Sequence, residues 1–272
     1  PFTPAAGPRL LAPTRELRQR LLRAALELAQ ELRASSLHLL FPPPQQACEL
    51  ESAGLMLRSG VQFHWLNHGY RDFDDFLSGM SHDKRKKIKQ ERRRVREADI
   101  QFVWLGGRDA TPAHWDFFTR CYKSTYRQHH STPYLNRAFF QRLAHTLPDN
   151  VVLIVASRNG EPLAAALNVH NGQTLWGRYW GSAQFIAGLH FETCYYQAIE
   201  FCIARGIRVF EGGAQGEHKL ARGFLPVTTY SGHWLAHPQF ARAVEEFLAR
   251  ETRGVAVYLD ELSEHTPFKA TT

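Results

Sequence analysis

The spacing of hydrophobic positions along the chain predicts a series of helices. The clearest is residues 14–34, where apolar positions recur with the helical period. The leucines that share one face of this segment are Leu17, Leu21, Leu28 and Leu32. Capping residues, prolines and the same period predict further helices at residues 45–53, 73–79, 81–98, 136–146, 190–205 and 217–222, and others that begin at Pro112 and Pro238.

Alternating or continuous apolar runs predict strands between these helices. The strongest signal is a meander of three strands at residues 151–157, 162–170 and 174–180, joined by Asn-Gly pairs at 159–160 and 171–172. Asn-Gly suits tight hairpin turns, so the three strands are expected to be antiparallel neighbours. Further strands are expected at residues 36–41, 55–66, 100–105, 207–211 and 227–235. This order predicts an α+β protein with a mixed sheet and an incomplete α/β unit in front.

The composition excludes several classes of protein. The chain has 272 residues, 44% of them hydrophobic and 22% charged, which is ordinary for a globular protein. No apolar run approaches the roughly 18–20 residues of a membrane span. The four cysteines lack CxxC spacing and are expected to be reduced thiols in the cytoplasm. HExxH, zinc-type Cys/His pairs and GxSxG are absent from the sequence, so neither a metal nor a serine nucleophile is expected.

The positive charge is concentrated in one segment. The net charge is +7, but residues 84–96 alone carry nine Lys or Arg and one acid, and the remainder has a net charge of −1. We expect a helix that Ser81 caps, with Ile88 and Val95 as its narrow apolar stripe. Its cations suit phosphates of tRNA, of a nucleotide-linked substrate or of anionic lipids, and a solvated helix without a partner is the alternative. The anion-binding candidates are Lys84, Arg85, Lys86, Lys87, Arg92 and Arg93.

Chemically versatile side chains are densest between residues 178 and 222. Alternation along the strand at 207–211 places Glu211 on an apolar face, where its carboxylate is a candidate general base unless an arginine pairs with it. His190 and Glu192 fall in the first turn of a helix that follows a glycine, where free N–H groups suit a phosphate or an oxyanion. The alternatives are a hydrogen-bonded core histidine and a glutamate that the helix dipole favours.

A glycine-rich turn, GGAQGEHKLARGF, follows this strand. It places His218, Lys219 and Arg222 on one helical turn, and it matches neither GxGxxG nor a phosphate-binding P-loop. A lysine beside such a turn suits the stabilisation of negative charge on a carbonyl oxygen or a phosphate, and an ordinary surface lysine is the alternative. The glycines of the turn are Gly212, Gly213 and Gly216.

Longer blocks of the sequence resemble a known family. The blocks are FHWLNHGYRDFDDFLSGMSHDKRKKIKQERRRV, YLNRAFF, LWGRYWG, LHFETCYYQAIEFCI and FEGGAQGEHKLARGFLP. They resemble the Fem-like family labelled peptidoglycan biosynthesis/recognition, whose members are similar to GNAT-fold N-acyltransferases. The resemblance implies a GNAT-like fold, with a mixed, mostly antiparallel sheet flanked by helices, as the C-terminal part of a tandem pair. Residues 1–67 would be the tail of a first half, and residues 68–272 a second acyltransferase domain that includes the basic helix at 81–98.

The resemblance also implies a role for one lysine. In the wider Fem transferases a Lys in a Phe-Lys-x-x-Phe block stabilises the oxyanion during aminoacyl transfer, and the matching position here is Lys219. His218 stands where the aromatic residue would be, and Phe224 lies downstream. The loop that acetyl-CoA users place before the corresponding helix is missing. The donor therefore stays open between acyl-CoA, such as acetyl-CoA, and aminoacyl-tRNA.

These observations together predict a cytoplasmic N-acyltransferase. It would transfer an acyl or aminoacyl group to the amine of a small molecule or peptide, with a cell-wall peptide precursor as one candidate acceptor. Glu211 or His218 would be the base, and Lys219 with Arg222 would stabilise the oxyanion or a phosphate. The alternative is a non-catalytic GNAT-like module that binds nucleic acid or a cell-wall polymer.

Other side chains are expected to hold the reactants. His190 and Glu192 would orient the acceptor amine at the start of the helix. The residues expected to line the groove for donor or acceptor are Arg178, Tyr179, Trp180, Arg222, Gly212, Gly213, Gln215 and Gly216. The basic helix would hold tRNA if tRNA carries the donor group.

Overall fold

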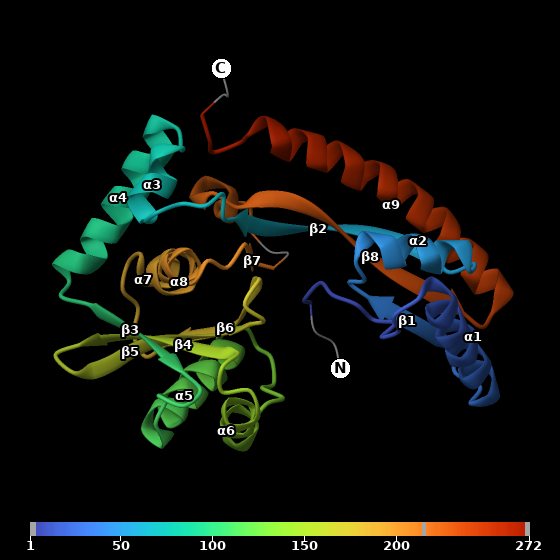
Figure 1. Cartoon of the computed structure of the whole chain (residues 1–272), viewed down its shortest axis with the longest axis horizontal. Helices are drawn as coiled ribbons and strands as arrows, with labels where there is room; N and C mark the ends of the chain where they lie inside the picture. Colours follow the sequence, from blue (N-terminus) through green and yellow to red (C-terminus); the bar gives the residue numbers. More distant parts are fainter. Residues whose placement is uncertain (1–3, 214–215, 270–272) are drawn as a thin grey trace. The chain divides into compact units, whose positions relative to one another are not determined.

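The computed structural model describes residues 4–213 and 216–269, which fall into two units (Figure 1). The first unit comprises Pro1–Phe63, Gly213–Gln215 and Pro226–His265, and the second comprises His64–Gly212, Gly216–Leu225 and Thr266–Thr272. The long C-terminal helix, α9 (Pro238–Glu264), therefore groups with the N-terminal segment. The sequence-based boundary between residues 67 and 68 stays a prediction.

The first unit contains the helices α1 (Arg15–Glu31), α2 (Pro44–Ser52) and α9, and the strands β1 (Ser36–Leu40), β8 (Leu225–Leu235) and most of β2 (Met56–Leu66). β1 and β8 are antiparallel. Thr14 caps α1 by accepting a hydrogen bond from the backbone N–H of Leu17. The buried residues of α1 are Leu22 and Ala29, and the predicted leucine face is exposed.

The second unit is built on a mixed sheet in the order β2-β7-β6-β5-β4-β3. Its strands are β3 (Gln101–Gly106), β4 (Val151–Arg158), β5 (Glu161–His170), β6 (Thr174–Ser182), β7 (Val209–Glu211) and the end of β2. β6 and β7 are parallel, and every other neighbouring pair is antiparallel. The predicted three-stranded meander is confirmed as β4-β5-β6, and the mixed, mostly antiparallel α+β fold is confirmed with it.

Helices cover both faces of this sheet (Figure 1). On one face α5 (Pro112–Gln128) and α6 (Arg137–Thr146) enclose a core with β4 and β5. On the other face lies a helical segment made of α7 (Leu189–Phe191), a π-helical turn η1 (Glu192–Tyr196) and α8 (Gln197–Arg205). Gly181 allows the close approach of β6 to α5, because a Cβ there would lie 2.4 Å from the carbonyl oxygen of Cys121.

The basic helix is α4 (His82–Glu97), which follows the short helix α3 (Phe73–Ser78). The predicted apolar stripe is confirmed, since Ile88 and Val95 are buried. The predicted cap is wrong: the Ser81 side chain makes no capping hydrogen bond, and its backbone N–H donates to the carbonyl of Pro267.

Candidate functional site

A cavity of about 150 Å³ lies in the second unit where β6 and β7 separate. The parallel pairing of these strands ends at Trp176 and Glu211, and the cavity is lined by residues just beyond, including Gly177 and Gly212. The register between β5 and β6 shifts here, so that Arg178 has no partner in β5. Such a bulge bends the strand and re-aims side chains, which opens space between two parallel strands.

Several predicted residues meet in this cavity. Its lining consists of Ala166, Leu167, Asn168, Gly177, Arg178, Tyr179, Trp180, His190, Cys194, Tyr195, Phe210 and Gly212. The predicted groove residues Arg178, Tyr179, Trp180 and Gly212 are among them, together with His190. Gly177 keeps the cavity open, because a Cβ there would lie 3.3 Å from the Phe210 ring. Sequence reasoning thus found about half of the lining from one strand and one helix start.

The π-helical turn η1 supplies two lining residues that the sequence did not reveal. The sequence predicted one continuous helix over residues 190–205, but its first turns are α7 and η1. A π-turn inserts an extra residue into the helical repeat and is often found at functional sites. Cys194 and Tyr195 belong to this turn and both line the cavity. Helical periodicity carries no signal for such a turn, which is why these residues were missed.

Lys219 is the most unusual titratable group next to the cavity. It lies in the 3₁₀ helix η2 (Glu217–Arg222) and is only 4% exposed, so it is not the surface lysine that was the alternative. Burial lowers the pKa of its ammonium to about 8, and the Cys194 thiol opposes part of this shift. Lys219 in turn opposes part of the rise that burial causes in the pKa of Cys194. Lys219 therefore acts electrostatically on a residue of the cavity wall.

A cluster of neutral imidazoles and a phenol adjoins this lysine. The Tyr195 hydroxyl lies 3.2 Å from Nε2 of His218, and the ring centroids of His190 and His218 are 6.5 Å apart. Burial, followed by the charges on His218, Arg222 and Lys219, lowers the pKa of His190 to about 4. Partial desolvation and the charges of Arg222 and Lys219 lower the pKa of His218, although much of this side chain is exposed to solvent. His218 is thus a neutral imidazole at neutral pH and can accept a proton.

Glu211 is buried, as the apolar strand predicted, but it does not line the cavity. Alternation along β7 places it on the opposite face from Phe210, which does line the cavity. Across β2 and β7 it is paired directly with His64, so the two side chains share a face. Burial lowers the pKa of His64 to about 4. The sequence could not reveal His64, because only the strand register brings it opposite Glu211.

Glu192 and Arg92 form a buried ion pair. Glu192 is 3% exposed, and its carboxylate receives the guanidinium of Arg92 at 2.9 and 3.1 Å. The same guanidinium also donates to Glu200 at 2.9 Å and lies 4.2 Å from the ring centroid of Phe73. The expected roles of Glu192 as an orienting group and of Arg92 as a phosphate ligand are therefore not supported by the geometry.

Arg222 and Glu91 form a second buried pair. The Arg222 guanidinium donates to both carboxylate oxygens of Glu91 at 2.8 and 3.0 Å and to the backbone oxygen of His218 at 2.7 Å. It also stacks over Phe191 at 3.4 Å. Glu91 in addition accepts a hydrogen bond from the Tyr196 hydroxyl. Arg222 is therefore occupied in fixing η2 to α4 rather than turned toward the cavity as predicted.

The remaining candidates fall into three groups. Gly216 has φ +93°, and a Cβ there would collide with the His218 ring, so the turn before η2 requires glycine. Gly213 belongs to the first unit, and Gln215 lies outside the described residues. On α4, Lys86, Lys87 and Arg93 are exposed, and Lys84 and Arg85 are partly exposed.

The described ranges show neither a metal-binding cluster nor a membrane-spanning helix. Within residues 4–213 and 216–269, no group of three or more His, Cys, Asp or Glu side chains is arranged to hold a metal ion. In the same ranges, no helix combines the length and the apolar character that a bilayer span requires.

Nearly the whole chain matches the model of one protein family. The family model for FemAB-like proteins, described as peptidoglycan biosynthesis/recognition, matches residues 1–270. The chain belongs to the FemAB-like family. This membership confirms the resemblance that the sequence blocks carried, and it supports acyl or aminoacyl transfer as the general class of activity. No curated protein matches this FemAB-like chain.

Solved structures agree on the fold of this FemAB-like protein. FemX has 11% identity and a TM-score of 0.58, with 85% of this chain and 80% of that chain covered. L-PGS from Bacillus licheniformis has 10% identity and a TM-score of 0.62, with 86% and 79% covered. The C-terminal domain of a putative lysylphosphatidylglycerol synthetase from Agrobacterium fabrum has 12% identity and a TM-score of 0.61, with 87% and 78% covered. At these identities the likeness establishes the fold alone.

Proposed function

We propose that this chain is an N-acyltransferase in which Lys219 stabilises the oxyanion formed during transfer to an amine. The observation that carries the proposal is the buried Lys219, whose pKa is about 8 and which interacts electrostatically with Cys194, a lining residue of the cavity where β6 and β7 separate. A cation held in a low-dielectric site stabilises developing negative charge far better than one in water. At pH 7 a group with this pKa is about nine-tenths protonated.

The chemistry follows from the residues around this cavity. The acceptor nitrogen attacks the carbonyl carbon of the donor ester or thioester, a C–N bond forms, and the carbonyl oxygen becomes an oxyanion next to the Lys219 ammonium. Collapse of this intermediate breaks the C–O or C–S bond and releases the tRNA hydroxyl or the thiol. The proton lost by the nitrogen goes to His218, whose neutral imidazole is exposed beside Tyr195, and His218 then gives it to the leaving oxygen or sulfur.

The acceptor in this proposal is a peptide amine of a cell-wall precursor, because the family is described as peptidoglycan biosynthesis/recognition. The reaction in this proposal takes place in the cytoplasm, where activated amino acids are available. Donor identity stays open between acyl-CoA and aminoacyl-tRNA. The aromatic walls of Tyr179, Trp180 and Tyr195 would exclude water from either ester.

A transfer assay tests this proposal directly. Purified protein is supplied with a lysine-containing pentapeptide precursor and either labelled acetyl-CoA or labelled alanyl-tRNA, and the acylated peptide is quantified by mass. We expect one donor to give product at a rate above the uncatalysed control, and a saturating amount of it to raise the melting midpoint by several degrees. Absence of both product and thermal shift with either donor would leave the non-catalytic binding module as the better reading.

The outer face of α4 suits a phosphate backbone, and we propose it as the tRNA contact if aminoacyl-tRNA is the donor. Its inner face is committed to the Glu91 and Arg92 ion pairs, whereas the outer face keeps its cations in solvent. A shallow hollow of about 420 Å³ runs along this face. It is lined by His82, Arg85, Lys86, Lys89, Gln90 and Arg93.

Reversal of two charges on this face should weaken tRNA binding. For Lys86→Glu combined with Lys87→Glu, we expect roughly tenfold or greater loss of affinity near 0.1 M salt, and a log–log salt slope that is less steep by about two. Filter binding over 50–200 mM salt measures both quantities. The matched control is Arg250→Glu with Arg253→Glu, the same charge change on the exposed surface of α9. Equal losses in both double variants would mean that only net charge matters and that α4 is no specific contact.

A further inference from the structure

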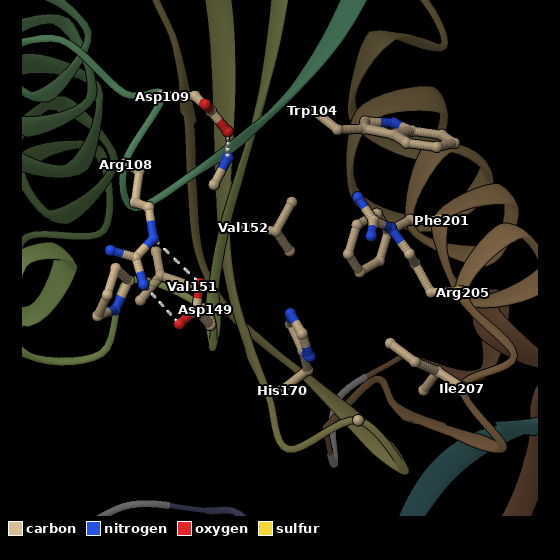
Figure 2. A pocket seen from close by; sticks show the side chains of 13 residues that line it. Trp104, Arg108, Asp109, Asp149, Val151, Val152, His170, Phe201, Arg205 and Ile207 are labelled. Carbon is tan, nitrogen blue, oxygen red and sulfur yellow. Dashed lines mark hydrogen bonds and ion pairs between the residues drawn. The ribbon is translucent and has the colours of Figure 1, made fainter.

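A second and larger cavity lies in the second unit and is shown in Figure 2. The cavity where β6 and β7 separate is called the transfer cavity below. Its volume is about 450 Å³, and Arg205 and Ile207 border it where α8 ends. Cys194 and Tyr195 of the transfer cavity stand at the opposite end of the same helical segment. Ten residues separate Tyr195 from Arg205, which corresponds to about 15 Å along the helix. The two cavities lie closer along β5, where Asn168 lines the transfer cavity and His170 lines this one.

Two facing walls of the cavity each carry an apolar side chain beside a basic one. Phe201 and Arg205 of α8 form one wall, and Val152 of β4 and His170 of β5 form the wall that faces it (Figure 2). The ring centroids of Phe201 and His170 are 5.6 Å apart at one edge. Flat or branched apolar groups fit between such walls and remove apolar surface from water.

Charge is distributed unevenly around the cavity. Arg108 and Asp149 form a bidentate ion pair at 2.7 and 3.2 Å, and Asp109 lies close enough to Arg108 to act on its charge. These three side chains together carry a net charge of −1. Arg205 lies 5.7 Å from the Phe201 ring centroid and forms no ion pair with any other residue in the described ranges. Arg205 is thus the one cation of the lining that no carboxylate in the described ranges pairs with. A second negative charge on a ligand would face Asp109 and Asp149.

His170 supplies a hydrogen-bonding atom that the described part of the chain does not use. Its Nδ1 is buried and has no hydrogen-bond partner there. Leaving a buried polar atom unpaired costs about 1–3 kcal/mol, so such atoms are normally satisfied. Burial and the charge of Arg205 both lower the pKa of His170, which shows that the two groups interact across the cavity wall. Both residues belong to the lining of the cavity.

We propose that this cavity binds a small monocarboxylate with a flat or branched apolar body. The carboxylate contacts the Arg205 guanidinium, and the apolar body lies between Phe201 and Val152. A single negative charge matches the single open cation, whereas a phosphate dianion would be repelled by Asp109 and Asp149.

Benzoate is the probe, and benzamide is its neutral control of equal shape. Isothermal titration of the full chain should show benzoate binding with a dissociation constant in the millimolar range or below, and at least about tenfold weaker binding of benzamide. Arg205→Gln should weaken benzoate binding by about tenfold or more. Arg208→Gln is the matched control, because Arg208 is exposed, close in the chain and not part of this cavity.

Four results would overturn the proposal. The first is that benzoate shows no binding at a concentration of about 10 mM. The second is that benzamide binds as tightly as benzoate. The third is that Arg208→Gln weakens binding as much as Arg205→Gln. Inorganic phosphate serves as a competitor, and displacement of benzoate by an equal concentration of phosphate would likewise contradict the monoanion. Arg205 is exposed, so its variant is expected to fold, and a thermal melt confirms this.

Discussion

Replacing Lys219 with alanine is expected to slow acyl transfer by about 100-fold or more, because loss of one preorganised oxyanion donor costs about that much. The melting midpoint should change little, since burial disfavours the charged form of Lys219 and alanine relieves that cost. Steady-state kcat with the active donor and a thermal melt measure the two effects.

The control for this variant is Lys269→Ala. Lys269 lies in the same unit and is exposed, and it is remote in sequence from the cavity residues. It should transfer at the wild-type rate. If Lys219→Ala stays within about threefold of wild type while Lys269→Ala is unaffected, Lys219 does not stabilise the oxyanion.

Replacing Glu91 with alanine is expected to lower the free energy of unfolding by about 3–5 kcal/mol. The variant leaves the Arg222 guanidinium, whose side chain is 4% exposed, without its carboxylate partner. It also removes the acceptor of the Tyr196 hydroxyl. Urea denaturation monitored by tryptophan fluorescence measures the loss.

Glu97 of the same helix provides the comparison. Its ion pair with Arg93 is exposed, at 3.6 Å with both side chains about two-thirds accessible, so Glu97→Ala should cost no more than about 0.5 kcal/mol. Similar costs for the two variants would show that the buried pair does not hold α4 in place.

α4 combines two uses of charge that the sequence presents as one. Nine cations in thirteen residues suggested a single phosphate-facing helix, yet Arg92 turns inward to Glu192 and Glu200. The only acid in the run, Glu91, also turns inward, to Arg222. Helical periodicity places these two residues beside Ile88 and Val95, but their partners lie about 100 residues or more further along the chain. Local patterns cannot reveal partners at that distance.

The predictions that succeeded depended on local chemistry. The two Asn-Gly turns and the alternation of β4, β5 and β6 are encoded within a few residues, and the antiparallel meander follows from them. The cavity residues Arg178, Tyr179 and Trp180 were found because they share one strand. Gly212 was among the predicted residues because it opens the glycine-rich turn, and His190 because it lies at a helix start after a glycine.

The parts that sequence reasoning missed depend on register and helix winding. The β-bulge at Arg178 and the π-turn at Cys194 and Tyr195 together shape the transfer cavity, and neither leaves a periodic signal. The burial of Lys219 is a consequence of how η2 packs, which the glycine-rich turn alone did not indicate. His64 reaches Glu211 only through pairing of β2 with β7.

The pH dependence of transfer tests the central claim that protonated Lys219 is the working form. The measurement is kcat/KM between pH 6 and 10 for the wild type and for Lys219→Arg, whose guanidinium stays charged throughout. Deprotonation of the acceptor amine affects both enzymes equally, so their ratio isolates Lys219. With a pKa of about 8, the wild-type value divided by that of Lys219→Arg should be constant at low pH and fall about tenfold per unit above pH 8. A ratio that rises through pH 8 would make Lys219 a base, and a ratio independent of pH would remove it from the transfer step.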